Sequence, residues 1–190
     1  NLKCKIFVAG HKGMVGSSLI KNLKKQGFQN IHVADKKKLD LVNQNSVLKF
    51  MDKNKFHQVY IAAAKVGGIV ANINNPADFI YDNTMIAANL INASYKTNVK
   101  KVLFFGSSCI YPKKNKIPIQ ESSLLSGYLE PTNLPYALSK ILGLIMCKSY
   151  NSQYKSKTIF RAVMPTNLYG YNDKYDPVNS HVIPALIYKF

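Results

Sequence analysis

Short apolar runs alternate with longer amphipathic segments along most of the chain. The apolar runs carry β-branched and aromatic residues with little polar alternation, as expected of strands buried on both faces of a sheet. We expect strands at 3–9, 31–34, 58–64, 101–106 and 158–163. The segments between them place apolar residues at helical spacing. We expect helices at 14–26, from Asn45 or Ser46 to Asn54, and at 76–97, 135–154 and 181–190.

This order of elements predicts the fold class. Strands that alternate with helices form a doubly wound, Rossmann-type α/β fold, in which helices cover both faces of a parallel sheet. A long loop rich in Pro, Ser and Lys at 111–133 should lie above a strand end. We find no internal repeat and expect one domain over residues 1–190. The sequence starts without Met and stops at Phe190 inside a predicted helix, so we expect it to be a fragment.

The composition is strongly basic, with 26 Lys and Arg against 9 Asp and Glu and a formal net charge of +17. Such a charge is compatible with nucleic-acid binding. However, Arg161 is the single arginine, and the lysines are scattered along the chain. The planar guanidinium of arginine binds phosphates and guanine edges better than the ammonium of lysine does. We therefore favour a general bias toward Lys and Asn, expect no nucleic-acid partner, and expect a surface that attracts anionic nucleotides.

The cysteines and the hydropathy favour a cytoplasmic protein. Cys4, Cys109 and Cys147 are few, odd in number and widely spaced, which argues against a disulfide framework. No apolar run reaches about 18 residues, so we expect no membrane span. The N-terminal apolar run has the character of a strand rather than of a signal peptide. No pair of His or Cys residues has the spacing of metal ligands, so we expect no metal site.

A glycine-rich loop joins the first predicted strand to the first predicted helix. Gly10, Gly13 and Gly16 are spaced three residues apart in it. In a dinucleotide-binding loop the first glycine permits a tight turn, the second lets the backbone approach the pyrophosphate, and the third allows close packing of helix on strand. Free N–H groups at the helix N-terminus then attract phosphates. The place of this loop between a strand and a helix favours cofactor binding over a structural turn.

The residues after the second predicted strand bear on the choice between NAD and NADP. Asp35 could accept hydrogen bonds from a ribose diol, whereas the run Lys36–Lys38 could neutralise a 2′-phosphate. Three adjacent lysines outweigh one carboxylate, so we expect NADP(H), although any single lysine is equally consistent with a solvated charge run. Asp40, between two leucines, is a candidate for binding the adenine edge.

A tyrosine and a lysine four residues apart form the clearest candidate for acid–base chemistry. Tyr136 and Lys140 share one face of the predicted helix at 135–154. A phenol with a pKa of about 10 is a poor acid–base group at neutral pH, and we expect the ammonium of Lys140 to lower that pKa. Ser107 follows a predicted strand and could hydrogen-bond the substrate oxygen that Tyr136 protonates. Together with the glycine loop, this cluster favours catalysis over a surface helix pair.

This constellation resembles the extended short-chain dehydrogenase/reductases. Longer runs resemble the GDP-L-fucose synthase family within them, over essentially all 190 residues. These runs are Ala-Ala-Ala-Lys-Val-Gly-Gly-Ile at 62–69, Gly-Ser-Ser-Cys-Ile-Tyr-Pro at 106–112, Glu-Pro-Thr-Asn at 130–133, Met-Pro-Thr-Asn-Leu-Tyr-Gly at 164–170 and Asn-Ser-His-Val-Ile-Pro-Ala-Leu at 179–186. The resemblance implies an oxidoreductase and isomerase that uses NADPH to convert GDP-4-keto-6-deoxy-D-mannose to GDP-L-fucose.

The resemblance also implies roles for particular residues. Ser107, Tyr136 and Lys140 would serve reduction at C4, while Cys109 and His181 would exchange protons at C3 and C5. Carbons that flank a C4 ketone are acidic, and reference pKa values of about 8.5 for a thiol and about 6.5 for an imidazole suit this exchange. By themselves, Cys109 is also consistent with a small packed residue and His181 with a structural one.

Two sets of binding residues follow from the motifs and the resemblance. Those expected to bind NADP(H) are Gly10, Lys12, Gly13, Met14, Val15, Gly16, Lys36, Lys37, Asp40, Leu41, Ala62, Ala63, Ala64, Phe105, Gly106, Ser107, Ser108, Tyr136, Lys140, Pro165, Thr166, Asn167, Leu168 and His181. Those expected to bind the GDP-sugar are Ser107, Ser108, Cys109, Tyr136, Asn167 and Lys189.

The sequence departs from the family pattern in three places. Leu134 stands where an acidic residue is typical, and Tyr171 stands where proline is usual. The family's substrate domain would begin near residues 172–190 and continue beyond the chain end. The resemblance further implies a homodimer. The alternatives are a nucleotide-sugar 4-epimerase or 4,6-dehydratase, or a non-catalytic dinucleotide-binding protein. A dehydratase is less favoured because no Asp-Glu pair follows Ser107.

Overall fold

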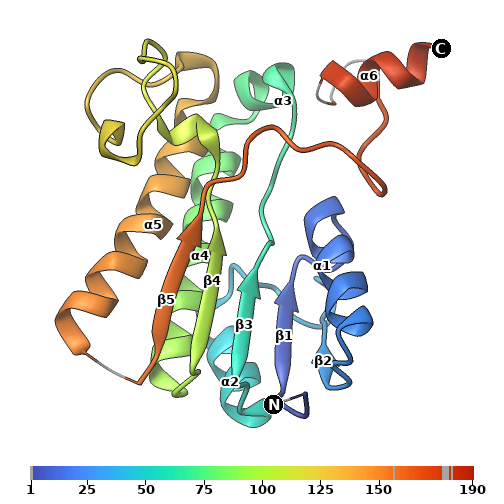
Figure 1. The fold of residues 1–190 in the computed structure, drawn as a ribbon, viewed down its shortest axis with the longest axis vertical. Coiled ribbons are helices and arrows are strands. Elements are labelled where there is room, and N and C mark those ends of the chain that lie inside the picture. Colours follow the sequence, from blue (N-terminus) through green and yellow to red (C-terminus); the bar gives the residue numbers. More distant parts are fainter. Residues whose placement is uncertain (1, 156, 177–179, 181) are drawn as a thin grey trace.

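The computed structural model describes residues 2–155, 157–176, 180 and 182–190, which contain a five-stranded parallel sheet (Figure 1). The strands are β1 (Ile6–Ala9), β2 (Ile31–His32), β3 (Gln58–Ile61), β4 (Lys101–Phe105) and β5 (Ile159–Val163). Their order in the sheet is β2-β1-β3-β4-β5. Each strand is shorter than the apolar run that predicted it: β2, β3 and β4 end earlier than expected, whereas β1 and β5 begin later. The predicted doubly wound parallel fold is confirmed.

The predicted helices are present, with changes at their ends. They are α1 (Met14–Lys25), α2 (Gln44–Asn54), α4 (Pro76–Lys96), α5 (Leu134–Tyr154) and α6 (Val182–Lys189). The predicted caps of α2 are wrong, because the N-cap is Asn43, whose Oδ1 accepts a hydrogen bond from the Ser46 N–H at 2.9 Å. In the described parts of the chain, the helices lack the combination of length and apolar character that a membrane crossing needs.

Four short elements lie above the strand ends and were not predicted. They are α3 (Ile69–Asn74) and the 3-10 helices η1 (Ser108–Ile110), η2 (Glu121–Ser123) and η3 (Pro131–Asn133). The last two lie within the predicted long loop at 111–133. Elements of three to six residues are too short to show a helical hydrophobic period, which explains why the pattern did not reveal them.

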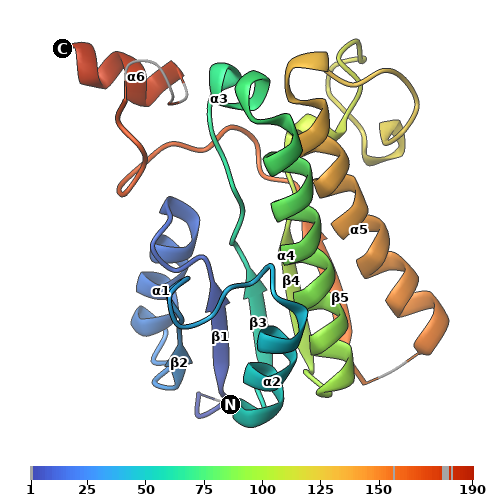
Figure 2. The same cartoon turned by 180° about the vertical axis from the view of Figure 1, so that it is seen from behind.

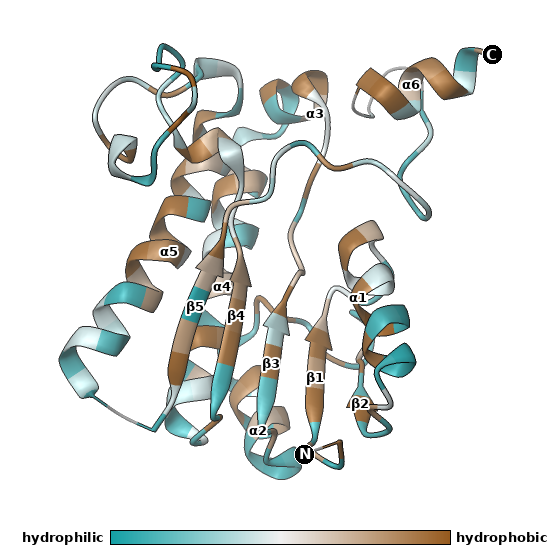
Figure 3. Cartoon of the chain, viewed as in Figure 1, coloured by the Kyte–Doolittle hydropathy of each residue, from teal (hydrophilic) through white to brown (hydrophobic). Residues whose placement is uncertain are grey.

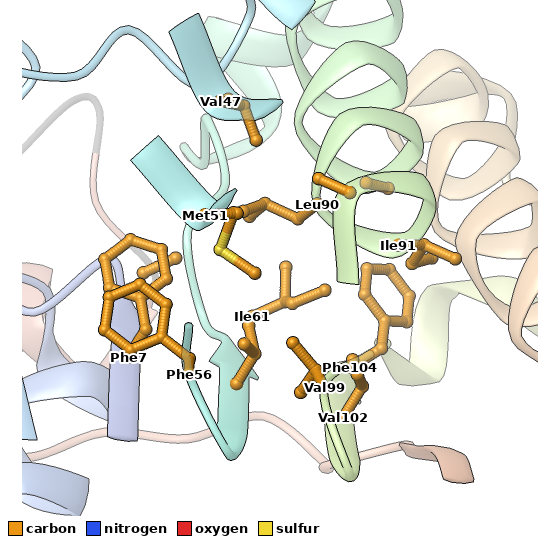
Figure 4. Packing of buried hydrophobic residues seen from close by; sticks show 14 of the residues in the cluster. Phe7, Val47, Met51, Phe56, Ile61, Leu90, Ile91, Val99, Val102 and Phe104 are labelled. Carbon is orange, nitrogen blue, oxygen red and sulfur yellow. The ribbon is translucent and has the colours of Figure 1, made fainter. Parts of the chain in front are cut away.

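Helices cover both faces of the sheet, with α1 on one face and α2, α4 and α5 on the other (Figures 1 and 2). The residues of β1 are apolar throughout (Figure 3), because both of its faces are covered. Ile6 and Val8 pack with Leu23 of α1. Phe7 belongs to the larger cluster on the opposite face, where it lies beside Phe56 (Figure 4).

The sheet order creates a crevice between β1 and β3. The chain passes outward from β1 to β2, and it then crosses back to place β3 on the other side of β1. The helix that follows β1 and the long helix after β3 therefore cover opposite faces. Ligands of such sheets bind at the carboxyl ends of the strands, where these connections diverge. The fold thus predicts the position of a site before any side chain is considered.

Candidate active site

A cleft of about 730 Å³ lies at the carboxyl ends of the strands. It is lined by the glycine loop, the ends of β2 and β3, the loop after β4, the start of α5 and the segment after β5. The predicted site residues that line it are Gly10, Lys12, Gly13, Met14, Val15, Gly16, Lys36, Asp40, Leu41, Ala62, Ala63, Ala64, Phe105, Gly106, Ser107, Cys109, Tyr136, Lys140, Pro165, Thr166, Asn167 and Leu168. The sequence motifs, although distant along the chain, therefore meet in one cavity.

The remaining predicted site residues lie elsewhere. Lys37, Ser108 and Lys189 are not among the residues that line the cleft in the described part of the chain. Lys189 is exposed on α6. His181 falls outside the described residues. The binding and catalytic roles of these residues stay predictions.

Close backbone packing holds the glycine loop at the crevice. Gly10 has a φ of +87°, a left-handed conformation that side chains rarely adopt, and a Cβ there would lie 2.5 Å from the Ala63 backbone nitrogen at the end of β3. A Cβ on Gly16 would lie 2.1 Å from the Gly10 carbonyl oxygen. Neighbouring backbone atoms leave no room for a side chain at either position. The two glycines therefore allow the start of α1 to pack against the strand ends.

Gly13 differs from its two neighbours and indicates a ligand. A Cβ on Gly13 would meet only the Gly10 carbonyl oxygen, at an ordinary contact distance of 3.5 Å. Gly13 is also the N-cap of α1 and provides no side-chain hydrogen bond to the first turn. The N–H groups of that turn are thus available to an anion, and the helix dipole favours one. The loop fits the pyrophosphate of a dinucleotide.

The end of β2 presents a cluster of charges to the cleft. The Asp35 carboxylate pairs with Lys12 at 2.8 Å and with His11 at 3.3 Å. The hydrogen bond from Lys12 holds the pKa of Asp35 below its usual value. Lys36 lines the cleft, whereas Lys37 and Lys38 do not belong to its lining. Asp40 also lines it, and one of its carboxylate oxygens accepts the Val42 N–H at 3.0 Å.

Two buried asparagines of α4 hold the loops around the cleft. Asn83 donates to the Lys65 carbonyl oxygen at 3.0 Å and accepts the Lys65 N–H at 2.7 Å. Asn89 donates to the carbonyl oxygens of Leu41 and Val42, both at 2.9 Å. The sequence analysis missed these residues. The available signal was the presence of asparagines, including these two, inside a predicted apolar helix, because a buried carboxamide needs a partner.

Tyr136 and Lys140 both line the cleft from the first turns of α5. The side chain of Lys140 is buried, and its Nζ donates a hydrogen bond to the Phe105 carbonyl oxygen at 2.8 Å. The same nitrogen lies 5.1 Å from the centre of the Phe104 ring and 5.7 Å from that of Tyr136. The expected shared face is therefore observed, and it points toward the end of β4.

The expected lowering of the Tyr136 pKa is wrong. Burial, together with the negative charge of Cys109, raises the pKa of Tyr136 to about 12, although a hydrogen bond with Ser107 opposes the rise. Burial also lowers the pKa of Lys140 to about 8. Desolvation is thus the main cause of both shifts in this cleft. Tyr136 consequently keeps its proton at neutral pH, which suits a proton donor.

Cys109 lies in η1, just beyond the end of β4, and lines the cleft with Ser107. The Ser107 hydroxyl accepts the Cys109 N–H at 3.3 Å and so caps this short helix. Cys4 and Cys147 are buried in the two cores. Cys109 is therefore the partly exposed thiol of the described chain. An acid, a hydroxyl and a thiol surround one space, which suits proton transfer to and from a bound carbonyl compound.

Comparisons with known proteins agree with this geometry. Residues 6–190 match the model of the NAD dependent epimerase/dehydratase family. A GDP-L-fucose synthase from Sinorhizobium fredii is 55% identical over 97% of this chain and 58% of its own length, and one from Escherichia coli is 52% identical over 99% and 58%. The chain thus spans somewhat more than half the length of these relatives.

A solved structure shows the same fold in a related enzyme. A GDP-D-glycero-L-gluco-heptose synthase from Campylobacter jejuni, crystallised in the presence of NADPH, has a TM-score of 0.94 and 43% identity. The match covers 100% of this chain and 55% of that one. These matches confirm the resemblance to extended short-chain dehydrogenase/reductases.

The different surroundings of Gly13 and Gly16 predict different effects of alanine. Gly16→Ala should lower the free energy of unfolding by about 1–3 kcal/mol, because its Cβ would overlap a backbone oxygen. Gly13→Ala should cost less stability than Gly16→Ala, because only the weaker N-cap preference of alanine opposes it, and it should weaken dinucleotide binding about tenfold or more, which is about 1.4 kcal/mol. Urea unfolding and a fluorescence titration with dinucleotide measure both effects. Equal loss of stability in the two variants would contradict the assignment of Gly13 to the ligand.

The buried ammonium predicts a pH-dependent effect of Lys140→Met on the ligand-free protein. The folded pKa of about 8 lies below the ordinary 10.5, so the unfolded state binds more protons between these values and folding becomes more favourable as the pH rises. Lys140→Met should therefore be more stable than the unchanged protein at pH 7, by on the order of 1–3 kcal/mol, and this difference should narrow toward pH 10. Urea unfolding at both pH values measures it.

Lys148→Met is the matched control, because Lys148 is an exposed lysine of the same helix. Its effect on stability should be small and should not change with pH. A Lys140→Met effect that stays constant from pH 7 to pH 10 would show that burial does not perturb this lysine.

Proposed function

Because the chain belongs to the NAD-dependent epimerase/dehydratase family, we propose that the protein carrying it uses NADPH to convert GDP-4-keto-6-deoxy-D-mannose to GDP-L-fucose. The observation that carries the proposal is the meeting of Ser107, Cys109, Tyr136 and Lys140 with the glycine loop in one cleft. Relatives named GDP-L-fucose synthase, at 52% and 55% identity, support this substrate.

The cleft offers groups for each part of NADPH. Gly13 and the first turn of α1 would hold the pyrophosphate, and Lys36 would face the 2′-phosphate. Lys140 would hold the ribose of the nicotinamide. When bound, the cofactor supplies a hydride for C4 of the sugar. Tyr136, which is neutral at pH 7, gives its proton to the C4 oxygen as the alcohol forms.

Inversion at C3 and C5 needs a base on one face of the sugar and an acid on the other. Cys109 as a thiolate would take a proton from carbon, and the electron pair of that C–H bond would pass onto the C4 oxygen. Ser107 and Tyr136 would stabilise this enolate through hydrogen bonds in a preorganised site. His181 would return a proton from the opposite face. The acidity of carbons beside a ketone makes both exchanges accessible at neutral pH.

We also propose a cytoplasmic homodimer. Leu138, Leu142 and Ile145 form an exposed apolar stripe along α5, with 41%, 37% and 38% of their surfaces accessible. A second copy that packs against this stripe and the neighbouring α4 would cover it. Free cysteines support a reducing compartment.

A second candidate is the synthesis of a GDP-linked heptose. The 43% identity and the TM-score of 0.94 to the Campylobacter jejuni enzyme favour it. Both candidates use the same cleft and differ in the sugar. Incubation of the protein with NADPH and GDP-4-keto-6-deoxy-D-mannose, followed by NMR of the product, separates them. If the protein binds NADPH but forms no GDP-L-fucose, the first candidate is excluded.

Cys109→Ser should separate inversion from reduction. A serine hydroxyl is a far weaker base than a thiolate, so deuterium uptake from D₂O at C3 and C5 should fall about 100-fold or more, while some hydride transfer to C4 persists. NMR of the sugar and NADPH absorbance at 340 nm measure the two steps. Cys4→Ser makes the same exchange in the core beneath α1 and should leave both steps intact. Full inversion in Cys109→Ser would remove the thiol from the mechanism.

Lys36→Ala should reduce the preference for NADPH over NADH. The loss of one cation beside a 2′-phosphate should lower this preference about tenfold, which is about 1.4 kcal/mol. Lys37→Ala is the control, because Lys37 does not line the cleft and its change should have a smaller effect. Ratios of kcat/KM for the two cofactors measure the preference. An unchanged ratio in Lys36→Ala would show that another residue selects the cofactor.

A further inference from the structure

Asn133 contacts the thiol that the proposed function assigns to proton exchange. Its Nδ2 lies 3.3 Å from Cys109 Sγ, and both residues line the cleft. A carboxamide N–H is a donor, and a thiolate accepts hydrogen bonds more strongly than a neutral thiol does. We propose that Asn133 is a positioning residue that holds the Cys109 sulfur in the cleft and favours its thiolate form. This inference deepens the proposed function and rests on it.

A rigid turn holds Asn133 in place. The residue ends η3, and its N–H donates to the Glu130 carbonyl oxygen at 3.3 Å. The Glu130 carboxylate caps this turn by accepting the N–H and the hydroxyl of Thr132, and it pairs with Lys113 at 2.7 Å. The hydrogen bond from Lys113 lowers the pKa of Glu130, so the carboxylate is charged at neutral pH. The Glu-Pro-Thr-Asn run therefore fixes the position of the Asn133 carboxamide.

The other end of this carboxamide is unoccupied by protein. Asn133 Oδ1 is buried and has no hydrogen-bond partner among the described residues. The sulfur is thus the contact that fixes the orientation of the amide. A turned amide would present Oδ1, which can accept the S–H of a neutral thiol. The observed orientation, with the Nδ2 donor toward the sulfur, is the one that suits the thiolate.

The charges near Cys109 explain why a neutral donor suits this position. Tyr136 faces it from α5, and the negative charge of Cys109 contributes to the raised pKa of that tyrosine. Glu130 of η3 is paired with Lys113. A cation in place of Asn133 would stabilise the thiolate but would also favour loss of the Tyr136 proton. An amide stabilises the sulfur without removing the proton that reduction needs.

The test is the rate at which iodoacetamide alkylates Cys109 in the ligand-free protein between pH 6 and pH 10. The thiolate sulfur displaces iodide and forms a C–S bond, so the rate reports the thiolate fraction. Peptide mass spectrometry identifies the modified cysteine. Asn133→Ala should react about three- to fourfold more slowly at pH 7, with its midpoint moved to higher pH and a limiting rate at high pH that is not reduced. Asn133→Asp lacks the donor, adds a negative charge, and should move the midpoint further.

Asn45→Ala is the control, because Asn45 is an exposed asparagine of α2. A change of the limiting rate alone in Asn133→Ala would mean that the residue affects only access to the sulfur, and this would overturn the inference. An unchanged profile in Asn133→Asp would overturn it as well. The Cys109→Ser experiment is independent of these outcomes, so failure of the thiol's role in inversion is distinguishable from failure of Asn133's role.

Discussion

The arrangement of the cleft depends on one buried hydrogen bond, from the Lys140 ammonium to the Phe105 carbonyl oxygen. This bond ties α5 to the last residue of β4. The cation also lies beside the rings of Phe104 and Tyr136, which contributes favourable cation–π contact. Burial of an ammonium opposes folding, so this position is maintained at a cost to stability that the surrounding packing offsets. The proton donor of the cleft owes its location to this contact.

Much of the fold could be predicted from the pattern of apolar residues. The alternation of buried runs with amphipathic segments identified all five strands and the five longer helices, and the glycine spacing identified the loop at the crevice. The ends of β2, β3 and β4 were placed too far along the chain; after β3, for example, apolar character continues through Ala62 and Ala63 although the strand has ended. The cap of α2 was misplaced because Asn43, Asn45 and Ser46 are chemically equivalent in sequence. Only geometry selects among them.

The residues of the site could be identified from the sequence more readily than their burial and pKa shifts. Spacing brought Tyr136 and Lys140 to one face but could not show the extent of their burial, and burial reversed the expected direction of the tyrosine pKa shift. Asn72 escaped notice, and Asn133 was noticed only within the run at 130–133 without a role in the site, because contact with the cleft depends on turns in α3 and η3. Amides recur as supports around this cleft. They bind backbone groups and sulfur without bringing a charge of their own into the cleft.

Asn83 and Asn89 make α4 a support for two loops of the crevice. Asn83 donates a hydrogen bond to the loop after β3. Asn89, six residues further along the same helix, donates to the loop after β2. Both walls of the crevice are therefore hydrogen-bonded to the same helix. The distance between these two loops is therefore tied to the spacing of two carboxamides along one helix.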